Sequence, residues 1–219
     1  MKSGRIFAGF IALAVLLSGC TGATTASAPQ TATPTATPTP TPTPTPTAAA
    51  LIVSLDGLSV VDAAGNTLDS ALFSAGLETI AFVSKYEGSD PTINDSLSPK
   101  GIRQFAWPDV DCSTQGANDR APAFCRVHVA ELAGIPVRTK DGIRVGSTRD
   151  DVLALKPVDN GYDGDGDGKS DSLGIEQQTM PDTQSLSFPG QPGTAYVSVG
   201  FAGDTVASLS APAGDFYDI

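Results

Sequence analysis

From residue 51 onward, apolar residues recur in short β-rich runs separated by turn residues. LIVSL (51–55) and LSVV (58–61) flank Asp56-Gly57, a pair typical of hairpin turns. Similar runs predict strands at 102–107, 124–132, 141–145, 172–180, 194–201 and 204–211.

The run 124–132 alternates apolar and polar side chains. The alternation puts Cys125, Val127 and Val129 on one face of a strand, and Arg126 and His128 on the other. His128 is the only histidine of the chain. No nucleophile is indicated beside it, so we interpret it as an exposed strand residue.

Two segments show helical spacing. Between Ser70 and Tyr86, apolar residues recur every three to four positions, and Gly88 follows as a stop. A second helix is expected to begin at Ser147 or Thr148, either of which can cap it, and to end at Pro157.

The predicted order of extended segments and a helix begins again in the second half of the globular region. CRVHVAELAG in residues 51–136 resembles AYVSVGFAG in residues 137–219, although any two antiparallel stretches resemble each other weakly. We therefore predict an α+β fold of two related halves, each with one helix packed on an antiparallel sheet. The acidic loop described below falls in the second half.

The segment GIRVGSTRDDVLAL (142–155) resembles the opening of the repeats in β-lactamase-inhibitor-protein-like domains. It is also similar to small outer-membrane assembly lipoproteins. The resemblance implies tandem αβ repeats and a concave sheet that grips a protein, but it assigns an inhibitory role to no residue here.

The N-terminus reads as a lipoprotein signal peptide over residues 1–19. Lys2 and Arg5 precede an apolar run at 6–17, which is shorter than the ~20 residues of a bilayer span. LSGC then resembles a bacterial lipobox, which predicts lipidation of Cys20 and a stable anchor of two or more acyl chains. The alternative is an ordinary secretory signal with a chance cysteine.

Residues 20–50 read as a disordered, Thr/Pro-rich linker with nothing to bury. Extended at ~3.1 Å per residue, this linker would hold a domain up to about 90 Å from the membrane. The whole chain resembles an actinobacterial cell-surface lipoprotein with a Thr-Pro stalk. Glycosylation of the stalk is a hypothesis.

The chain carries a formal charge of −11, and removal of Lys2 and Arg5 takes it to −13. This charge disfavours nucleic acid and anionic lipid as partners, and it suits cations or a basic partner. The sequence leaves the oligomeric state open.

Two cysteines remain once Cys20 is lipidated. In an oxidising compartment, Cys112 and Cys125 are expected to form a disulfide worth about 3 kcal/mol in the chain-entropy model. The alternative is a pair of free thiols.

Within YDGDGDGKSD (162–171), residues 163–171 match the first nine positions of a calcium loop of EF-hand type. Gly174 stands where an EF-hand has its twelfth-position glutamate, so the loop is a truncated variant that joins strands. The candidate ligands are the side chains of Asp163, Asp165, Asp167 and Asp171 and the carbonyl of Lys169.

Oxygen-only ligands favour calcium, in a structural role and with a dissociation constant of about 10⁻⁴ to 10⁻³ M. The alternative is a soluble Asp-Gly hairpin that binds no ion.

Catalytic motifs are absent from the sequence: it contains no G-x-S-x-G, S-x-x-K or H-E-x-x-H. Glu131 and Glu176 are the one pair considered for glycoside hydrolysis. Trp107, beside Phe105 and Pro108, is interpreted as core packing, with a ligand platform as the alternative.

We expect a non-enzymatic binding protein, lipid-anchored on the outer side of the cell membrane, with an envelope or secreted protein as its partner. The alternatives are an envelope hydrolase with an unrecognised carboxylate site and a purely structural cell-wall component.

Overall fold

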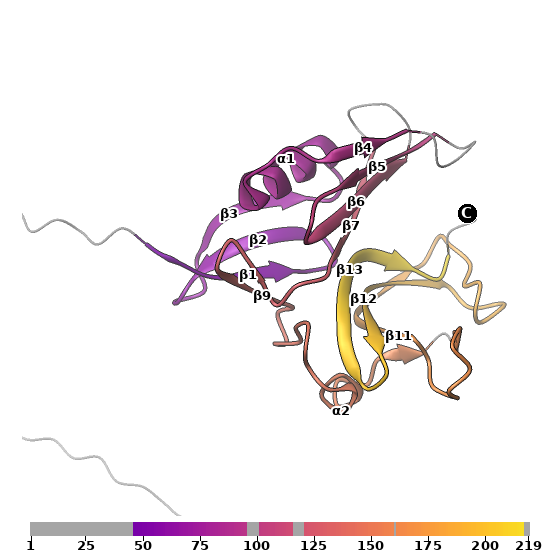
Figure 1. Ribbon diagram of the computed structural model, residues 1–219. Coiled ribbons are helices and arrows are strands. Elements are labelled where there is room, and N and C mark those ends of the chain that lie inside the picture. Colours follow the sequence, from indigo (N-terminus) through magenta and orange to yellow (C-terminus); the bar gives the residue numbers. More distant parts are fainter. Residues whose placement is uncertain (1–45, 96–100, 116–120, 160, 217–219) are drawn as a thin grey trace, which may run out of the picture. The chain divides into compact units, whose positions relative to one another are not determined.

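The computed structural model describes residues 46–95, 101–115, 121–159 and 161–216 (Figure 1). The predicted signal peptide, Cys20 and nearly all of the linker lie outside these residues. In the part described, the chain forms strands β1 (Ala48–Val53), β2 (Gly57–Asp62), β3 (Thr67–Leu72), β4 (Thr92–Asn94), β5 (Ile102–Ala106), β6 (Val110–Gln115), β7 (Ala123–Val127), β8 (Glu131–Leu132), β9 (Ile135–Arg138), β10 (Val158–Asp159), β11 (Ser172–Met180), β12 (Gly193–Ala202) and β13 (Thr205–Gly214). The helices are α1 (Gly76–Glu87) and α2 (Arg149–Leu153).

The strands form two sheets. The first has the order β3-β2-β1-β9-β8, and the second has the order β10-β11-β12-β13-β7-β6-β5-β4. Neighbouring strands are antiparallel except that β9 runs parallel to β1. Helix α1 packs against β3 of the first sheet and against β6 and β7 of the second (Figure 1).

The predicted fold class is wrong. Of the described residues, 47% are in strands and 11% in helices, and no two halves each pack a helix on a sheet. Strand β7 pairs with β13, so the second sheet joins strands from both predicted halves. The segments that resemble each other, in β7 and β12, lie two strands apart in this one sheet.

The physical reason for this error lies in α2 and in the nature of strand pairing. Helix α2 has five residues and buries only Val152, so it is too short to cover a sheet. Alternation along a strand shows which side chains are buried, but every strand presents the same backbone donors and acceptors. The hydrophobic pattern of a strand therefore does not identify the strand with which it pairs.

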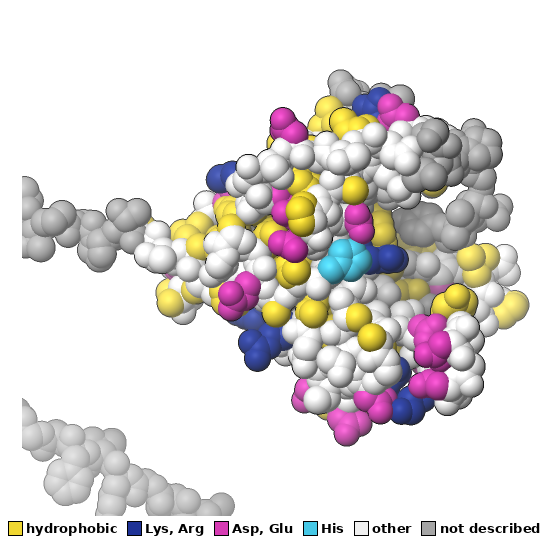
Figure 2. Space-filling model, in the orientation of Figure 1, with side chains coloured by type: hydrophobic (Ala, Val, Ile, Leu, Met, Phe, Trp, Pro, Cys, Tyr) yellow, Lys and Arg dark blue, Asp and Glu magenta, His cyan; other side chains and the backbone are white. Residues whose placement is uncertain are grey.

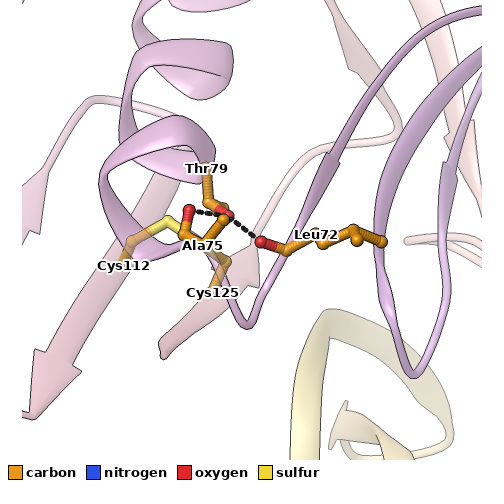
Figure 3. The surroundings of a disulfide bond; sticks show 5 residues. All are labelled: Leu72, Ala75, Thr79, Cys112 and Cys125. Atoms are coloured by element: carbon orange, nitrogen blue, oxygen red, sulfur yellow. Dashed lines mark hydrogen bonds between the residues drawn. A yellow bond between two sulfur atoms is a disulfide. The ribbon is translucent and has the colours of Figure 1, made fainter. Parts of the chain in front are cut away.

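Helix α1 begins later than predicted. Residues 67–72 form strand β3 instead, because they pair with β2. The Thr79 hydroxyl then donates to the carbonyl of Leu72 and ties the helix to the end of that strand (Figure 3). The helix ends as expected, with Gly88 in the left-handed conformation at φ 71°.

One apolar core joins the two sheets. It includes fully buried valines and leucines from both, among them Leu51 and Val53 of β1, Val197 of β12 and Leu209 of β13. Each such side chain contributes about 1.5–3 kcal/mol relative to exposure. Trp107 is buried in this core and its Nε1–H donates to the carbonyl of Ser89, which confirms the packing interpretation.

The predicted disulfide is confirmed. Cys112 on β6 and Cys125 on β7 are directly opposite each other and are bonded (Figure 3). Both are buried in the core beneath α1. The bond therefore joins two neighbouring strands of the second sheet.

Candidate functional site

Three aspartates of the acidic loop converge between β10 and β11. The carboxylate oxygens of Asp163, Asp165 and Asp171 lie within 4.8 Å of one another. Backbone N–H groups hold them: Asp163 accepts from Gly166 and Gly168, at 2.7 and 2.9 Å. Gly168 has φ 82°, which a residue with a side chain rarely adopts.

The base of this loop is closed by backbone hydrogen bonds. The N–H of Asp171 donates to the carbonyl of Tyr162, and the N–H of Phe201 donates to the carbonyl of Asp171. The Asp171 carboxylate also accepts from the N–H of Gly164 at 2.8 Å. The acidic loop is therefore fastened to β12 at its C-terminal end.

The Asp167 side chain, a predicted ligand, stands apart from the three converging aspartates, and Lys169, whose carbonyl is the predicted ligand, has its side chain paired elsewhere. The Asp167 carboxylate accepts from the backbone N–H of Lys169 and is not in the converging group. The Lys169 side chain forms an ion pair with Asp204 at 2.7 Å. The hydrogen bond from Lys169 is the main reason that the pKa of Asp204 lies below its ordinary value.

Sequence reasoning missed the role of Arg149, which braces the loop from α2. Its Nη1 donates to the carbonyl of Ser170 and its Nη2 to that of Gly203, at 2.8 and 2.9 Å. Its Nε donates to Asp204, and its guanidinium lies over the ring of Phe201. No pattern around Arg149 in the sequence indicates that its side chain contacts Ser170 and Gly203, which are distant along the chain.

The three converging aspartates fit a hard divalent cation. Calcium–oxygen distances are about 2.3–2.6 Å, so ligand oxygens across the ion stand about 5 Å apart, close to the separation found here. All donors are carboxylate oxygens, which calcium prefers and which zinc and copper do not. Without a cation, the three charges repel one another.

A second group of polar side chains lies on the outward face of the second sheet. Asp111 on β6 is directly opposite Arg126 on β7, and Arg126 is directly opposite Ser210 on β13. Arg126 donates to the Ser210 hydroxyl at 3.1 Å, and the His128 ring lies 2.9 Å from the Asp111 carboxylate. Arg126 and His128 are both exposed, as the alternation predicted, but the predicted strand 124–132 is interrupted: β7 ends at Val127, so His128 lies just beyond it, and β8 begins at Glu131.

This face is hollowed. Figure 2 shows basic, acidic and histidine side chains close together near the middle of the molecule. A cavity of about 270 Å³ is lined by Asp111, Arg126 and Phe124. A second cavity, of about 360 Å³, adjoins it at Phe124 and is mainly apolar, with Ile102 and Leu186 in its lining.

The carboxylates considered for hydrolysis lie in different sheets, Glu131 on β8 and Glu176 on β11. The Glu176 side chain is only 3% exposed, with Oε2 3.4 Å from the Lys140 Nζ. Its Oε1 has no hydrogen-bond partner among the described residues. Its backbone is left-handed at φ 54°, within a bulge opposite β12.

No family model, no curated protein and no solved structure matches the chain. In the part of the chain that is described, neither helix is long and apolar enough to cross a bilayer.

Proposed function

We propose that the protein is a non-enzymatic binding protein of the cell envelope, anchored to the outer side of the membrane by lipid on Cys20 and stabilised by calcium. The observation that carries the proposal is the convergence of the Asp163, Asp165 and Asp171 carboxylates within 4.8 Å. Extracellular fluids supply calcium at concentrations that a site of modest affinity needs.

In this proposal calcium stabilises the end of the second sheet that is formed by β10, β11 and β12. The loop joins β10 to β11 and is fastened to β12 through the carbonyl of Asp171. Neutralising the three charges holds the start of β11 in register with β12. The buried disulfide suits the same oxidising compartment.

The binding role rests on the hollowed outward face of the second sheet. Its cavities combine an apolar lining with a small number of polar groups, which is the usual composition of a ligand site. The partner we propose is an envelope or secreted protein.

Thermal unfolding with and without calcium tests the metal site. At 10 mM calcium, a dissociation constant of 10⁻⁴ to 10⁻³ M corresponds to about 1.4–2.7 kcal/mol of stabilisation. The melting temperature should therefore rise by about 3–10 °C. Magnesium, which needs a tighter octahedral site, should raise it less.

The matched variants are Asp165→Asn and Asp167→Asn. Each removes one charge from the same loop, but only Asp165 belongs to the converging group. We expect D165N to abolish the calcium-dependent shift and D167N to keep most of it. Equal loss in both would show a general charge effect instead of a site.

Metabolic labelling with a radioactive fatty acid tests the anchor. Labelled fatty acid should be incorporated into the wild-type chain and not into Cys20→Ala, which should appear in the medium. Labelling that persists in C20A would reject lipidation at this residue.

A further inference from the structure

We propose that the cavity on the outward face of β5, β6 and β7 binds a free amino acid, whose carboxylate pairs with Arg126 and whose ammonium pairs with Asp111. This inference goes beyond the proposed function, because it adds a small zwitterion to the protein partner proposed above.

Asp111 and Arg126 are neighbours that do not pair with each other. They are directly opposite on β6 and β7. The Cβ atoms of such a pair stand about 4.5–5.5 Å apart, and opposite charges in this position attract each other. Among the described residues, however, no ion pair joins these two side chains. The fold therefore keeps two adjacent opposite charges apart.

Two other side chains hold these charges in place. The Nε of Arg126 donates to the hydroxyl of Ser210 on β13 at 3.1 Å, and Ser210 is only 4% exposed. Because β13 and β6 flank β7 on opposite sides, this bond draws the guanidinium away from Asp111. The Asp111 carboxylate is held instead through Oδ2, which lies 2.9 Å from Nε2 of His128.

The atoms that remain match the two charged groups of an amino acid. Within the part of the chain that the structure describes, Nη1 and Nη2 of Arg126 donate to no other residue, and Oδ1 of Asp111 accepts from none. A guanidinium offers parallel N–H groups to a carboxylate, and a carboxylate oxygen accepts from an ammonium. An α-amino acid carries both charges on one small molecule, so it can bridge two groups that do not reach each other.

The cavity beside these charges has the lining of a small-molecule site. Its volume of about 270 Å³ is below the ~300–1,000 Å³ of sites for drug-sized ligands, so it suits a smaller molecule. Figure 2 shows the single histidine beside basic and acidic side chains on this face. Apart from Asp111 and Arg126, the lining is uncharged: Gln104, Phe105, Ala106, Cys112, Ser113 and Phe124. An uncharged lining favours an amino acid with an apolar side chain.

Isothermal titration calorimetry on the full-length protein tests this inference with three matched probes. L-leucine carries both charges, N-acetyl-L-leucine lacks the ammonium, and L-leucine methyl ester lacks the carboxylate. We expect L-leucine to bind with a dissociation constant of about 1 mM or below, and each analogue to bind about tenfold more weakly or worse, because each leaves one charge of the site without its partner.

The probes also show which outcomes reject the site. Equal affinity for L-leucine and N-acetyl-L-leucine would overturn the inference, because a simple anion site needs Arg126 alone. Equal affinity for L-leucine and its methyl ester would overturn it as well, because a simple cation site needs Asp111 alone. No heat of binding with L-leucine at about 10 mM would likewise reject it.

Two arginine variants provide the matched control. Arg103 lies on β5 of the same sheet, but it pairs with Asp95 and does not line the cavity. We expect Arg126→Gln to weaken binding of L-leucine about tenfold or more and Arg103→Gln to change it less than about twofold. Equal loss in R126Q and R103Q would show a general charge effect and overturn the inference.

Asp111→Asn tests the other half of the site. The substitution keeps the size of a side chain that is 56% exposed, so the variant should fold, and its melting temperature checks this. We expect D111N to weaken binding of L-leucine about tenfold and to leave the weak binding of N-acetyl-L-leucine unchanged or improved. Unchanged affinity of D111N for L-leucine would reject the assignment of Asp111.

The two proposals fail separately. If L-leucine does not bind while Cys20 is lipidated and calcium raises the melting temperature, only the amino-acid site falls. If L-leucine binds but C20A is still labelled, the anchor assignment falls instead.

Discussion

The guanidinium of Arg149 lies over the ring of Phe201, with its Cζ 4.0 Å from the ring centroid. This contact joins the start of α2 to the end of β12. Together with hydrogen bonds to the carbonyls of Ser170 and Gly203, it ties the acidic loop, the β12–β13 turn and the helix into one unit.

Arg149→Ala should lower the free energy of unfolding by about 2–3 kcal/mol. The side chain is only 12% exposed, and its removal leaves two carbonyls without their charged donor. Urea denaturation measures the change. Arg149→Lys should recover little, because an ammonium cannot donate in three directions from a plane.

The control for this prediction is Arg144→Ala. Arg144 is an exposed arginine five positions earlier, and its substitution should change stability by less than about 0.5 kcal/mol. A similar loss in both variants would show that net charge, not the Arg149 contacts, is responsible.

Glu87→Gln should stabilise the protein at neutral pH relative to wild type. Burial, with a smaller contribution from Asp109, raises the pKa of Glu87 above its ordinary value of 4.5. Its Oε1 has no hydrogen-bond partner among the described residues. The folded state therefore binds the proton more tightly than the unfolded state does, and wild-type stability falls as pH rises from about 4.5 through the raised pKa.

Denaturation of both proteins from pH 4 to pH 8 measures this effect. The advantage of E87Q should grow as pH rises above about 4.5, because the wild type loses stability over that interval and an amide does not titrate. The advantage should shrink toward pH 4, where both states of the wild type are protonated. A difference that stays constant over this range would contradict the assignment.

Removal of the disulfide should cost about 3 kcal/mol. The cysteines are 13 residues apart, and the bond restricts the unfolded chain accordingly. The double variant Cys112→Ala/Cys125→Ala measures the effect by denaturation. The reduced wild type should lose a similar amount, and a much smaller loss would mean that pairing of β6 with β7 suffices without the bond.

Gly174→Ala should destabilise the second sheet by about 1–3 kcal/mol, because its Cβ would lie 2.6 Å from the buried ring of Tyr196 on β12. The control is Gly164→Ala in calcium-free buffer. Its Cβ would lie 2.9 Å from the hydroxyl of Tyr162 and 3.0 Å from a carboxylate oxygen of Asp171, which are the ends of an exposed and a half-buried side chain that can move away. Equal melting temperatures for the two variants would contradict this account.

The sequence by itself determined several local features of this protein, although residues 141–145 form no strand and α2 ends at Leu153 instead of Pro157. Alternation predicted that Arg126 and His128 are both exposed, and Gly88 marked the end of α1. Thr148 forms the expected cap, with the Asp151 carboxylate accepting from it in return. These features depend on residues within a few positions of one another, so short-range patterns reveal them.

Only the tertiary structure decided which strands meet. It placed β7 beside β13, made β9 parallel to β1, and drew strands from both predicted halves into one sheet. It also brought Arg149 to the acidic loop and separated Asp167 from the other three aspartates. The backbone of every strand offers the same hydrogen bonds, so burial across the whole core selects the pairing.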